Sequence, residues 1–461
     1  MLLYVITTIW YLVQKKEEKR RRIALGQISL IVMLDLLAYL VLFQQTGDVT
    51  LWVLFGGQML FLAIYQTVFR VFYRDGSRLL MNHLCMLMCV GLIMQTRLNP
   101  SKAWMQFLIA GLSAAATCMV PLITRYWRRI YNLRWIFGLF GIVALGLTFL
   151  TAQTEYGAKL SVTIGNISVQ LSEIVKVSFV FFVAASFQKC IQFRQVVITT
   201  IVAALHVLVL MACRDLGGAL ILFLSYVFML YVATHNGWYF ASGMGAGALA
   251  CVVAYLLFSH VQVRVHTWLD PWSDITGNGW QIAQSLFAIG AGGWFGVGLC
   301  EGMPTTIPVV IKDFIFSAIC EEMGGIFAIG VLLIYVSCLV HFMWTAMQMT
   351  ENFHKIVTFG LTCVMAIQIL LNVGGVTKFI PMTGVTLPLI SYGGSSVLST
   401  FLLFHVVQGF ILMYKNEGKT FEKQEKAKST TSPTKAKRND KGTNKGSNEK
   451  SNEKSNKVGR E

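Results

Sequence analysis

The sequence contains few charged residues for its length. Only 13% of its 461 residues are Asp, Glu, Lys or Arg, whereas 55% are hydrophobic. A soluble domain carries about 25% charged residues, so this composition excludes an ordinary soluble enzyme or binding module. It predicts a protein that crosses a membrane many times.

The sequence also lacks the short motifs of several enzyme and binding classes. No P-loop occurs, and none of the ten cysteines forms a CxxC pair, so neither a zinc site nor a disulfide framework is indicated. The glycine run GAGGWFGVG follows no strand, which argues against a dinucleotide site. No segment alternates in polarity like a strand, and no basic motif is interleaved with aromatic residues. We therefore expect an all-α protein with no nucleic-acid partner.

Twelve apolar segments are long enough to cross the membrane. A crossing helix needs about 20 residues, so the apolar segment 1–13 is too short for a regular span. The twelve segments lie near residues 23–43, 51–69, 79–95, 104–123, 135–151, 169–187, 196–212, 216–232, 239–258, 315–345, 356–373 and 397–413.

Basic loops predict the orientation of these segments. If QKKEEKRRR at 14–22 lies in the cytoplasm, the other arginine-rich loops also fall inside, as the positive-inside rule requires. The loops 152–168 and 374–396 and the large loop 259–314 then lie outside. The tail 415–461 falls inside and carries 14 Lys and Arg against 7 Asp and Glu. We expect this tail to be disordered and to touch anionic lipid headgroups.

Four polar clusters interrupt the apolar segments, although ionisable residues at membrane depth are costly and often functional. In the first, Glu173 and Lys176 stand three residues apart at the start of a helix. That spacing allows either a local ion pair or a polar patch that faces a substrate cavity. In the second, Arg214 and Asp215 occupy a break between two apolar segments. Asp215 either caps the next helix or helps to shape a cavity.

The third cluster extends over the end of the large outer loop. Gln281 and Gln284 lie on an amphipathic segment, and Asp313 precedes the next apolar segment, where it is a candidate helix N-cap. Glu321 and Glu322 follow eight and nine residues later, about 12–14 Å deeper along a continuous helix. They are too far from Asp313 to pair with it, so we expect them to pair with other helices or to bind water.

The fourth cluster is FIPMTGVTLPLISYGGSS, which contains two prolines and the serines Ser391, Ser395 and Ser396. Such an irregular backbone cannot face lipid, because its amides would be unsatisfied, so it must line a watery or protein-enclosed site. Capping of the last helix is the alternative role for Ser395 and Ser396, and no neighbouring histidine supports a serine hydrolase. All four clusters map to the outer half of the membrane, which predicts one shared cavity.

Several stretches, in this order, resemble the SEDS family of shape, elongation, division and sporulation proteins, of the FtsW, RodA and SpoVE types. They are GAKLSVTIGNISVQLSEIVK, RDLGGALILF, GNGWQIAQSLFAIGAGGWFGVGL, DFIFSAICEEMG and TGVTLPLISYGGSS. The resemblance covers residues 79–414 and implies a ten-helix core. Residues 1–78 then form two or three extra membrane segments.

The resemblance implies a peptidoglycan glycosyltransferase. Such an enzyme polymerises lipid II at the outer face of the cytoplasmic membrane and releases undecaprenyl diphosphate, with a class B penicillin-binding protein as its partner. The role can be elongation, division or sporulation. The family's essential aspartate maps to Asp313, its Glu–Lys helix pair to Glu173 and Lys176, and the aspartate of its Asp-Leu-Gly motif to Asp215.

The chemistry of this reaction needs a base and a cation. A carboxylate beside a sugar hydroxyl acts as a general base, and cations stabilise the leaving diphosphate. The expected cations are Lys176, Arg214, Lys312 or a bound divalent ion such as Mg²⁺ or Mn²⁺. Ile311 and Lys312 stand where the family usually has His-Thr. Lys312 would lower the pKa of Asp313 unless burial or the substrate diphosphate offsets it.

Two other kinds of protein would show many of these sequence features. A transporter or flippase of lipid-linked precursors would also carry buried charges and broken helices, but it favours an inverted repeat, and the polar motifs here are unequal. A catalytically inactive scaffold would not need Asp313. Formation of glycan polymer from lipid II by the purified protein separates all three.

Overall fold

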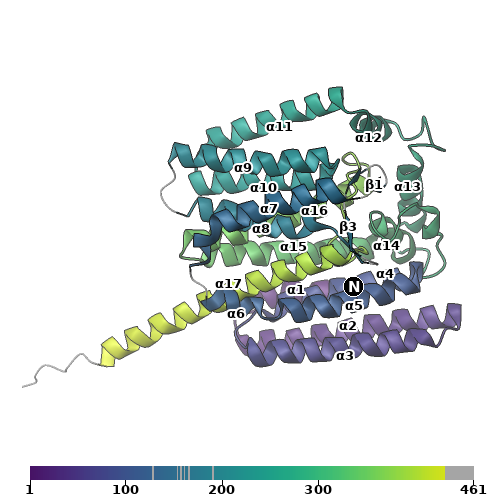
Figure 1. The fold of residues 1–461 in the computed structure, drawn as a ribbon. Coiled ribbons are helices and arrows are strands. Elements are labelled where there is room, and N and C mark those ends of the chain that lie inside the picture. Colours follow the sequence, from purple (N-terminus) through teal and green to yellow (C-terminus); the bar gives the residue numbers. More distant parts are fainter. Residues whose placement is uncertain are drawn as a thin grey trace, which may run out of the picture. The chain divides into compact units, whose positions relative to one another are not determined.

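The computed structural model describes residues 1–126, 129–152, 154–155, 158–159, 161–164, 167–188 and 192–430 (Figure 1). The chain divides into two compact units, Met1–Lys415 and Asn416–Glu461. The elements are α1 (Leu2–Val13), α2 (Glu17–Thr46), α3 (Thr50–Phe72), α4 (Arg78–Leu98), α5 (Pro100–Thr117), α6 (Val120–Tyr126), η1 (Ile130–Leu133), α7 (Arg134–Thr151), β1 (Thr154–Glu155), β2 (Ala158–Lys159), β3 (Val162–Ile164), β4 (Ile167–Val169), α8 (Leu171–Ser186), α9 (Phe193–Ala212), α10 (Leu216–Thr234), α11 (Gly237–Leu257), α12 (Ser259–Leu269), α13 (Trp280–Gly292), η2 (Pro304–Thr306), α14 (Ile315–Met323), α15 (Gly325–Gln348), α16 (Asn352–Val376) and α17 (Gly394–Thr430).

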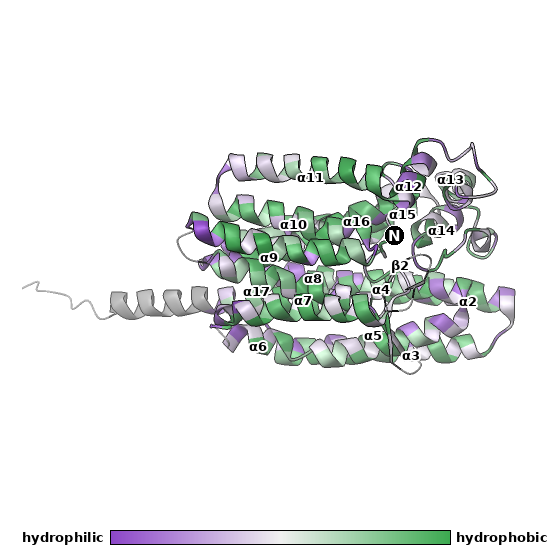
Figure 2. Ribbon diagram, turned by 45° about the horizontal axis from the view of Figure 1, so that its top comes forward, coloured by the Kyte–Doolittle hydropathy of each residue, from purple (hydrophilic) through white to green (hydrophobic). Residues whose placement is uncertain are grey.

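The prediction of an all-α polytopic membrane protein is confirmed. Eleven helices within the described residues are long and apolar enough to cross a membrane, and hydrophobic residues dominate their lengths (Figure 2). The remaining predicted segment, 169–187, corresponds to helix α8, which has 16 residues and packs among them. Helix α1 has 12 residues, which span about 18 Å at 1.5 Å per residue. It is therefore too short to cross a hydrocarbon core of about 30 Å.

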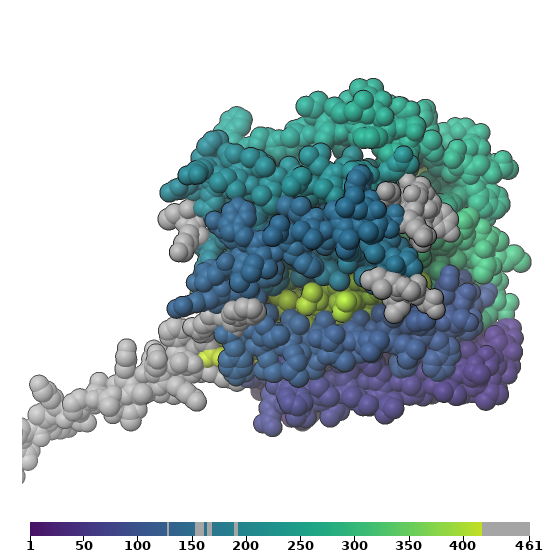
Figure 3. All heavy atoms as spheres, in the orientation of Figure 1, coloured from purple at the N-terminus to yellow at the C-terminus, as the bar shows by residue number. Residues whose placement is uncertain are grey.

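Helix α4 occupies the centre of the bundle. The apolar stretch of α4 is completely buried inside the protein. The apolar stretch of α11 is only 6% buried, so α11 presents most of its surface to lipid. In Figure 3, atoms of α17 are visible as a yellow-green strip between α5 and α7. Helix α4 packs against α2, α5 and α15. At Gly91, α4 packs directly against the segment before α17, since a Cβ there would lie 2.6 Å from the backbone oxygen of Leu389.

Buried polar side chains join the extra N-terminal helices to α4. Tyr4 of α1 hydrogen-bonds through its hydroxyl to Nδ1 of His83 over 2.9 Å. Asn82 donates to Gln27 of α2 over 3.0 Å and accepts a hydrogen bond from Gln66 of α3 over 3.1 Å. Each of these helices therefore has its own polar anchor on α4, in surroundings where unpaired polar groups are costly.

One predicted span is divided into two helices. The segment 315–345 is broken at Gly324, whose φ of 86° ends α14 before α15 begins. A Cβ at Gly324 would lie 2.4 Å from the backbone nitrogen of Gly296, so the preceding loop packs directly on the break. The prediction of one continuous segment over 315–345 is therefore wrong, although Glu321 and Glu322 precede the break and lie on the continuous helix α14.

Two further predictions differ from the structure. No strand was expected, but β1 pairs with β2 and β3 with β4 in two antiparallel hairpins. Strands of two or three residues are too short to show alternating polarity. The tail was expected to be disordered from residue 415, but α17 continues to Thr430. Extending an existing helix avoids the cost of nucleation. Residues 431–461 lie outside the described residues.

The loops predicted to lie outside gather at one end of the first unit. Helices α12, α13 and α14 and strands β1 and β3 lie at this end, and α6 lies at the other (Figure 1). Gln45, at the end of α2, donates a 3.0 Å hydrogen bond to Glu301 of the large loop. We refer to this end as the loop end.

We predict that Gly91→Leu prevents stable packing of α4 against the segment before α17. The obstructing atoms belong to the backbone and cannot rotate away, so overpacking should cost about 3 kcal/mol or more. Thermal unfolding of the purified protein would measure the loss. Gly111→Leu is the control, because a Cβ at Gly111 meets nothing within 4 Å. Equal unfolding temperatures for the two variants would contradict the prediction.

Candidate functional site

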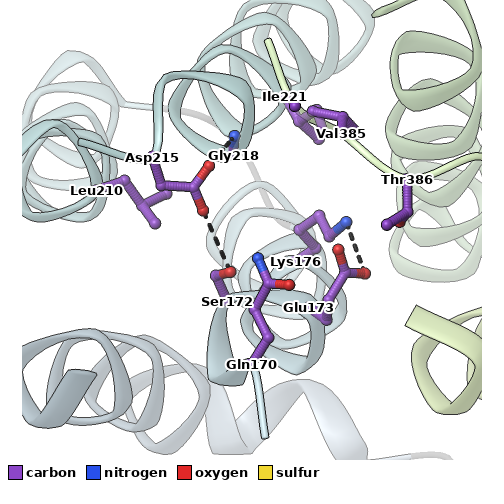
Figure 4. A pocket seen from close by; sticks show the side chains of 11 residues that line it. Gln170, Ser172, Glu173, Lys176, Leu210, Asp215, Gly218, Ile221, Val385 and Thr386 are labelled. Carbon is purple, nitrogen blue, oxygen red and sulfur yellow. Dashed lines mark hydrogen bonds and ion pairs between the residues drawn. The ribbon is translucent and has the colours of Figure 1, made fainter. Parts of the chain in front are cut away.

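A polar pocket opens near the loop end of the bundle (Figure 4). It encloses about 380 Å³ of space, which includes its open mouth. The sequence predicts one cavity for all four polar clusters, and residues of the first, second and fourth clusters line this pocket. The lining residues are Gln170, Ser172, Glu173, Lys176, Leu210, Asp215, Gly218, Ile221, Gly384, Val385 and Thr386.

Glu173 and Lys176 form an ion pair in the first two turns of α8. Lys176 Nζ lies 2.8 Å from Glu173 Oε2, and the two side chains are only 6–7% exposed. Lys176 also donates to Gln368 of α16 over 2.9 Å, and Ser399 of α17 donates to Glu173 over 3.0 Å. The predicted pairing is confirmed, and partners on two other helices fix its position.

Asp215 is both a helix cap and a pocket residue. Its Oδ1 accepts a 2.8 Å hydrogen bond from the Gly218 backbone N–H and so caps α10. Its Oδ2 accepts a 3.3 Å hydrogen bond from Ser172. Burial raises the pKa of Asp215, while the Gly218 hydrogen bond and the charge of Lys176 oppose the rise. A Cβ at Gly218 would lie 2.6 Å from Asp215 Oδ2, so the carboxylate needs glycine there.

Asp313 lies at the margin of the same pocket. It does not cap α14, because Phe314 is the cap residue and makes no side-chain cap hydrogen bond. A Cβ at Gly384, which lines the pocket, would lie 3.7 Å from Asp313 Oδ2. Asn372 donates both to the Asp313 carbonyl over 2.9 Å and to the Val385 carbonyl over 2.7 Å. This amide therefore ties the backbone of Asp313 to the pocket wall.

The surroundings of Asp313 make its carboxylate a better proton acceptor than an exposed aspartate. Burial raises its pKa from the usual value to about 6, although the charges of Lys312 and Arg264 act in the opposite direction. The expected effect of Lys312 is therefore present, and burial outweighs it. Among the hydrogen bonds of the described residues, none reaches the Asp313 carboxylate, so both oxygens can accept a proton or a hydroxyl group.

Arg264 is a site residue that the sequence did not reveal. Its Nη1 donates to the Met382 carbonyl over 2.9 Å, and its charge acts on both Asp313 and Asp215. It belongs to α12, where Trp268 also anchors the helix through a 3.1 Å hydrogen bond to the Lys378 carbonyl. The segment SHVQVRVHTWL has no recognisable motif, and only an arginine among apolar residues of an outer loop marked it.

The irregular segment 377–393 is held by side-chain donors from several helices. Besides Arg264, Trp268 and Asn372, these donors include residues of α4, α5, α15 and α16. They are Gln95 to the Ile390 carbonyl, Gln106 to the Ser391 carbonyl, Tyr335 to the Pro388 carbonyl and Gln368 to the Thr386 carbonyl. Its second part, 387–391, is buried by protein, whereas Phe379 and Gly384 are exposed, which fits the predicted watery or protein-enclosed site.

The three predicted serines lie behind the pocket wall. Ser395 Oγ accepts a 2.8 Å hydrogen bond from the Gln170 backbone N–H, and Ser396 hydrogen-bonds to Thr386 over 2.9 Å. Both partners line the pocket, so these serines position its wall. Ser391 is almost fully buried and accepts a backbone hydrogen bond within its own loop.

Four other predicted site residues do not line this pocket, and one of them is the half-buried Lys312 beside Asp313. Gln281 is exposed and Gln284 half-buried on α13, which packs against α14. Arg214 is exposed beside Asp215, with a positive φ of 61°. The structure therefore does not bring them to the pocket wall.

Glu321 and Glu322 stabilise the large loop at the loop end. Glu322 forms a 3.0 Å ion pair with Arg97 of α4, which confirms the expected pairing with another helix. Glu321 accepts a 2.9 Å hydrogen bond from the Met303 backbone N–H. Burial raises the pKa of Glu322, and the charge of Arg97 opposes the rise.

Comparisons with known proteins give close sequence relatives. Peptidoglycan glycosyltransferase RodA of Mycobacterium tuberculosis is 34% identical over 321 residues, which cover 66% of this chain and 68% of that protein. RodA of Mycobacterium leprae is 30% identical, and the match covers 77% of this chain and 83% of that protein. Stage V sporulation protein E of Bacillus subtilis is 30% identical, and the match covers 63% of this chain and 82% of that protein.

Solved structures share the fold. A peptidoglycan synthase complex, described as coordinating polymerization and crosslinking, contains a chain with a TM-score of 0.63 and 22% identity, and the match covers 74% of this chain and 98% of that chain. The Thermus thermophilus rod shape determining protein RodA gives a TM-score of 0.54 and 20% identity, with 74% and 97% covered. The cell cycle protein family model of FtsW, RodA and SpoVE matches residues 76–415, which is most of the chain. The protein therefore belongs to this family, as its sequence motifs indicated.

Proposed function

We propose that the protein is a peptidoglycan glycosyltransferase that polymerises lipid II into glycan strands and releases undecaprenyl diphosphate. Family membership and the names of the relatives support this reaction. The observation that carries the proposal is the Asp313 carboxylate, which accepts no hydrogen bond within the described residues and adjoins a polar pocket containing Lys176.

In the proposed reaction, Asp313 acts as the general base. It accepts the proton of a sugar hydroxyl while that oxygen bonds to the anomeric carbon of a lipid-linked sugar. The bond from this carbon to the diphosphate breaks, and the diphosphate leaves with both bonding electrons. A pKa of about 6 suits the task, because most of the carboxylate is ionised at neutral pH yet remains basic.

Cations stabilise the negative charge that develops on the diphosphate. Lys176 lines the pocket, and Lys312 and Arg264 both act electrostatically on Asp313. Nowhere in the described ranges do three or more His, Cys, Asp or Glu side chains form a group that could hold a metal ion. If a Mg²⁺ or Mn²⁺ ion binds, Asp215 and Asp313 would hold it, and its charge would help to stabilise the leaving diphosphate.

The proposed topology places the loop end outside the cytoplasmic membrane and the basic tail in the cytoplasm. The distribution of Lys and Arg supports it. Lipid II and the growing glycan strand then reach the pocket from the membrane surface. The tail would touch anionic lipids. A class B penicillin-binding protein is the proposed partner, and the fold shared with a chain of a polymerising and crosslinking complex supports it.

We predict that Asp313→Asn abolishes polymerisation by the purified protein, because the amide keeps the shape of the carboxylate but not its basicity. Loss of a general base should lower the rate about 10²–10⁴-fold. Gel analysis of glycan strands formed from lipid II measures it, and an unchanged unfolding temperature controls for folding. Near-normal polymer from this variant would disprove the assignment of the base. Movement of lipid II across vesicles without polymer formation by the unaltered protein would instead favour a transporter.

We predict that the rate rises with pH through about 6 as Asp313 loses its proton. Lys312→Gln removes a positive charge that lowers this pKa, so the acid side of the profile should move to higher pH. Initial polymerisation rates between about pH 5 and pH 8 test the shift. A profile that moves to lower pH, or stays in place, would contradict the proposed electrostatics.

We predict that Glu173 and Lys176 are coupled in folding. Removing either partner leaves a buried unpaired charge, which costs about 3–5 kcal/mol, whereas replacing both with leucine costs less. Thermal unfolding of Glu173→Leu, Lys176→Leu and the double variant measures the coupling. The double variant should fold better than either single variant yet remain inactive, because Lys176 is a proposed diphosphate ligand. A double variant less stable than both single variants would rule out the coupling.

A further inference from the structure

A second cavity adjoins the pocket at the Glu173–Lys176 ion pair. It encloses about 280 Å³ of space, which includes its opening, and both Glu173 and Lys176 line it as well as the pocket. Its other walls come from α8, α16, α17 and the segment before α17, and most of these lining residues are apolar. We call it the inner cavity. The ion pair therefore stands between two cavities, and Lys176 borders both.

Lys176 has two hydrogen-bond partners in the described part of the chain. Its Nζ lies 2.8 Å from Glu173 Oε2 and donates to Gln368 Oε1 over 2.9 Å. An ammonium group has three N–H donors in a tetrahedral arrangement, so two hydrogen bonds fix the direction of the third. With Glu173 as its only partner, the ammonium group can turn towards either cavity. The hydrogen bond to Gln368 removes this freedom.

Gln368 is held in place on its other side. Its Nε2 donates to the Thr386 carbonyl over 3.0 Å, and the residue is only 5% exposed. Because Nε2 faces a carbonyl, Oε1 is the amide atom that faces Lys176. Thr386 lines the pocket, and Figure 4 shows the Lys176 side chain extending towards it. Gln368 therefore joins Lys176 to the pocket wall, which requires a donor and an acceptor on one side chain.

Helix α16 holds the proposed base through a different side chain. Asn372 follows Gln368 by four residues and so lies on the same face of α16. Its amide donates to the Asp313 carbonyl over 2.9 Å and to the Val385 carbonyl over 2.7 Å. Val385 and Thr386 are neighbours in the chain, so α16 ties the base and the cation to adjacent points of the pocket wall. A change at Gln368 leaves the hydrogen bonds of Asn372 in place.

We propose that Gln368 is a positioning residue that directs the Lys176 ammonium group towards a diphosphate in the pocket and keeps it out of the inner cavity. The inference rests on the proposed reaction, in which Lys176 binds the diphosphate of a lipid-linked substrate. Gln368 lines the inner cavity and not the pocket, so it does not itself contact a ligand in the pocket. Its effect must therefore pass through Lys176 and appear in the affinity for diphosphate.

The test measures binding of undecaprenyl diphosphate to the purified full-length protein. Gln368→Met keeps the length of the side chain and removes both hydrogen-bonding groups. Loss of a directed hydrogen bond from a charged donor should weaken binding about 10-fold or more. The KM for lipid II should rise by a similar factor. The pH profile of polymerisation should stay in place, because Asn372 still holds Asp313.

Gln58→Met is the matched control. Gln58 is also a buried glutamine, 4% exposed, and it donates to the Tyr39 hydroxyl over 2.6 Å among the N-terminal helices. This variant should bind undecaprenyl diphosphate normally. Equal affinities of the Gln368→Met and Gln58→Met variants would overturn the proposal. If Gln368→Met does not fold, Gln368→Asn decides in the same way, because its amide is one methylene too short to join Lys176 to Thr386.

A combined variant tests whether the effect passes through Lys176. Adding Gln368→Met to the double variant of Glu173→Leu and Lys176→Leu should cause no further loss of affinity, because the group that Gln368 positions is already absent. A further loss would show that Gln368 acts by another route and would overturn the proposal.

The same measurements separate this inference from the proposed reaction. If the unaltered protein forms no polymer but binds undecaprenyl diphosphate, and Gln368→Met weakens that binding, the reaction is wrong and the positioning role stands. If the unaltered protein forms polymer and Gln368→Met has the same KM as Gln58→Met, the positioning role alone is wrong.

Discussion

The site depends on one constraint: the polar groups of the irregular backbone between α16 and α17 must form hydrogen bonds inside an apolar bundle. Carbonyl groups that leave helical hydrogen bonding cannot remain unpaired at membrane depth. Side chains of five helices supply the donors, among them Gln95 of α4, Asn372 of α16 and Arg264 of α12. Since Asn372 also holds the Asp313 carbonyl, the same hydrogen bonds that stabilise this segment position the proposed base.

Burial raises the pKa of Asp313 and of Asp215, and nearby positive charges oppose the rise. Asp313 has no hydrogen-bond donor among the described residues, so burial dominates and its pKa rises to about 6. The Glu173 carboxylate instead has Lys176 at 2.8 Å and a hydroxyl donor at 3.0 Å. One carboxylate is thus available to take a proton, while the other holds the Lys176 ammonium group at the pocket wall.

The sequence predicted an all-α membrane protein, the Glu173–Lys176 pair and a cavity shared by the polar clusters, three of which line the pocket. These features follow from hydropathy, helical spacing and the rule against lipid-exposed irregular backbone. The sequence did not predict the break at Gly324, since the apolar pattern continues through it and only the approach of Gly296 requires it. Arg264 was missed because its role arises from contacts between α12 and a segment more than a hundred residues away. Gln281 and Gln284 were chosen from amphipathic character, which does not distinguish a pocket wall from a neighbouring surface.

The polar anchors between the N-terminal helices and α4 bear on how this chain can be divided. Asn82 and His83 lie within the family core, but their partners Gln27, Gln66 and Tyr4 lie before it. A core cut out at residue 76 would expose an amide and an imidazole to hydrocarbon on the helix that supports the pocket segment through Gln95. The hydrogen bonds therefore make the N-terminal helices part of the folded unit that contains the pocket.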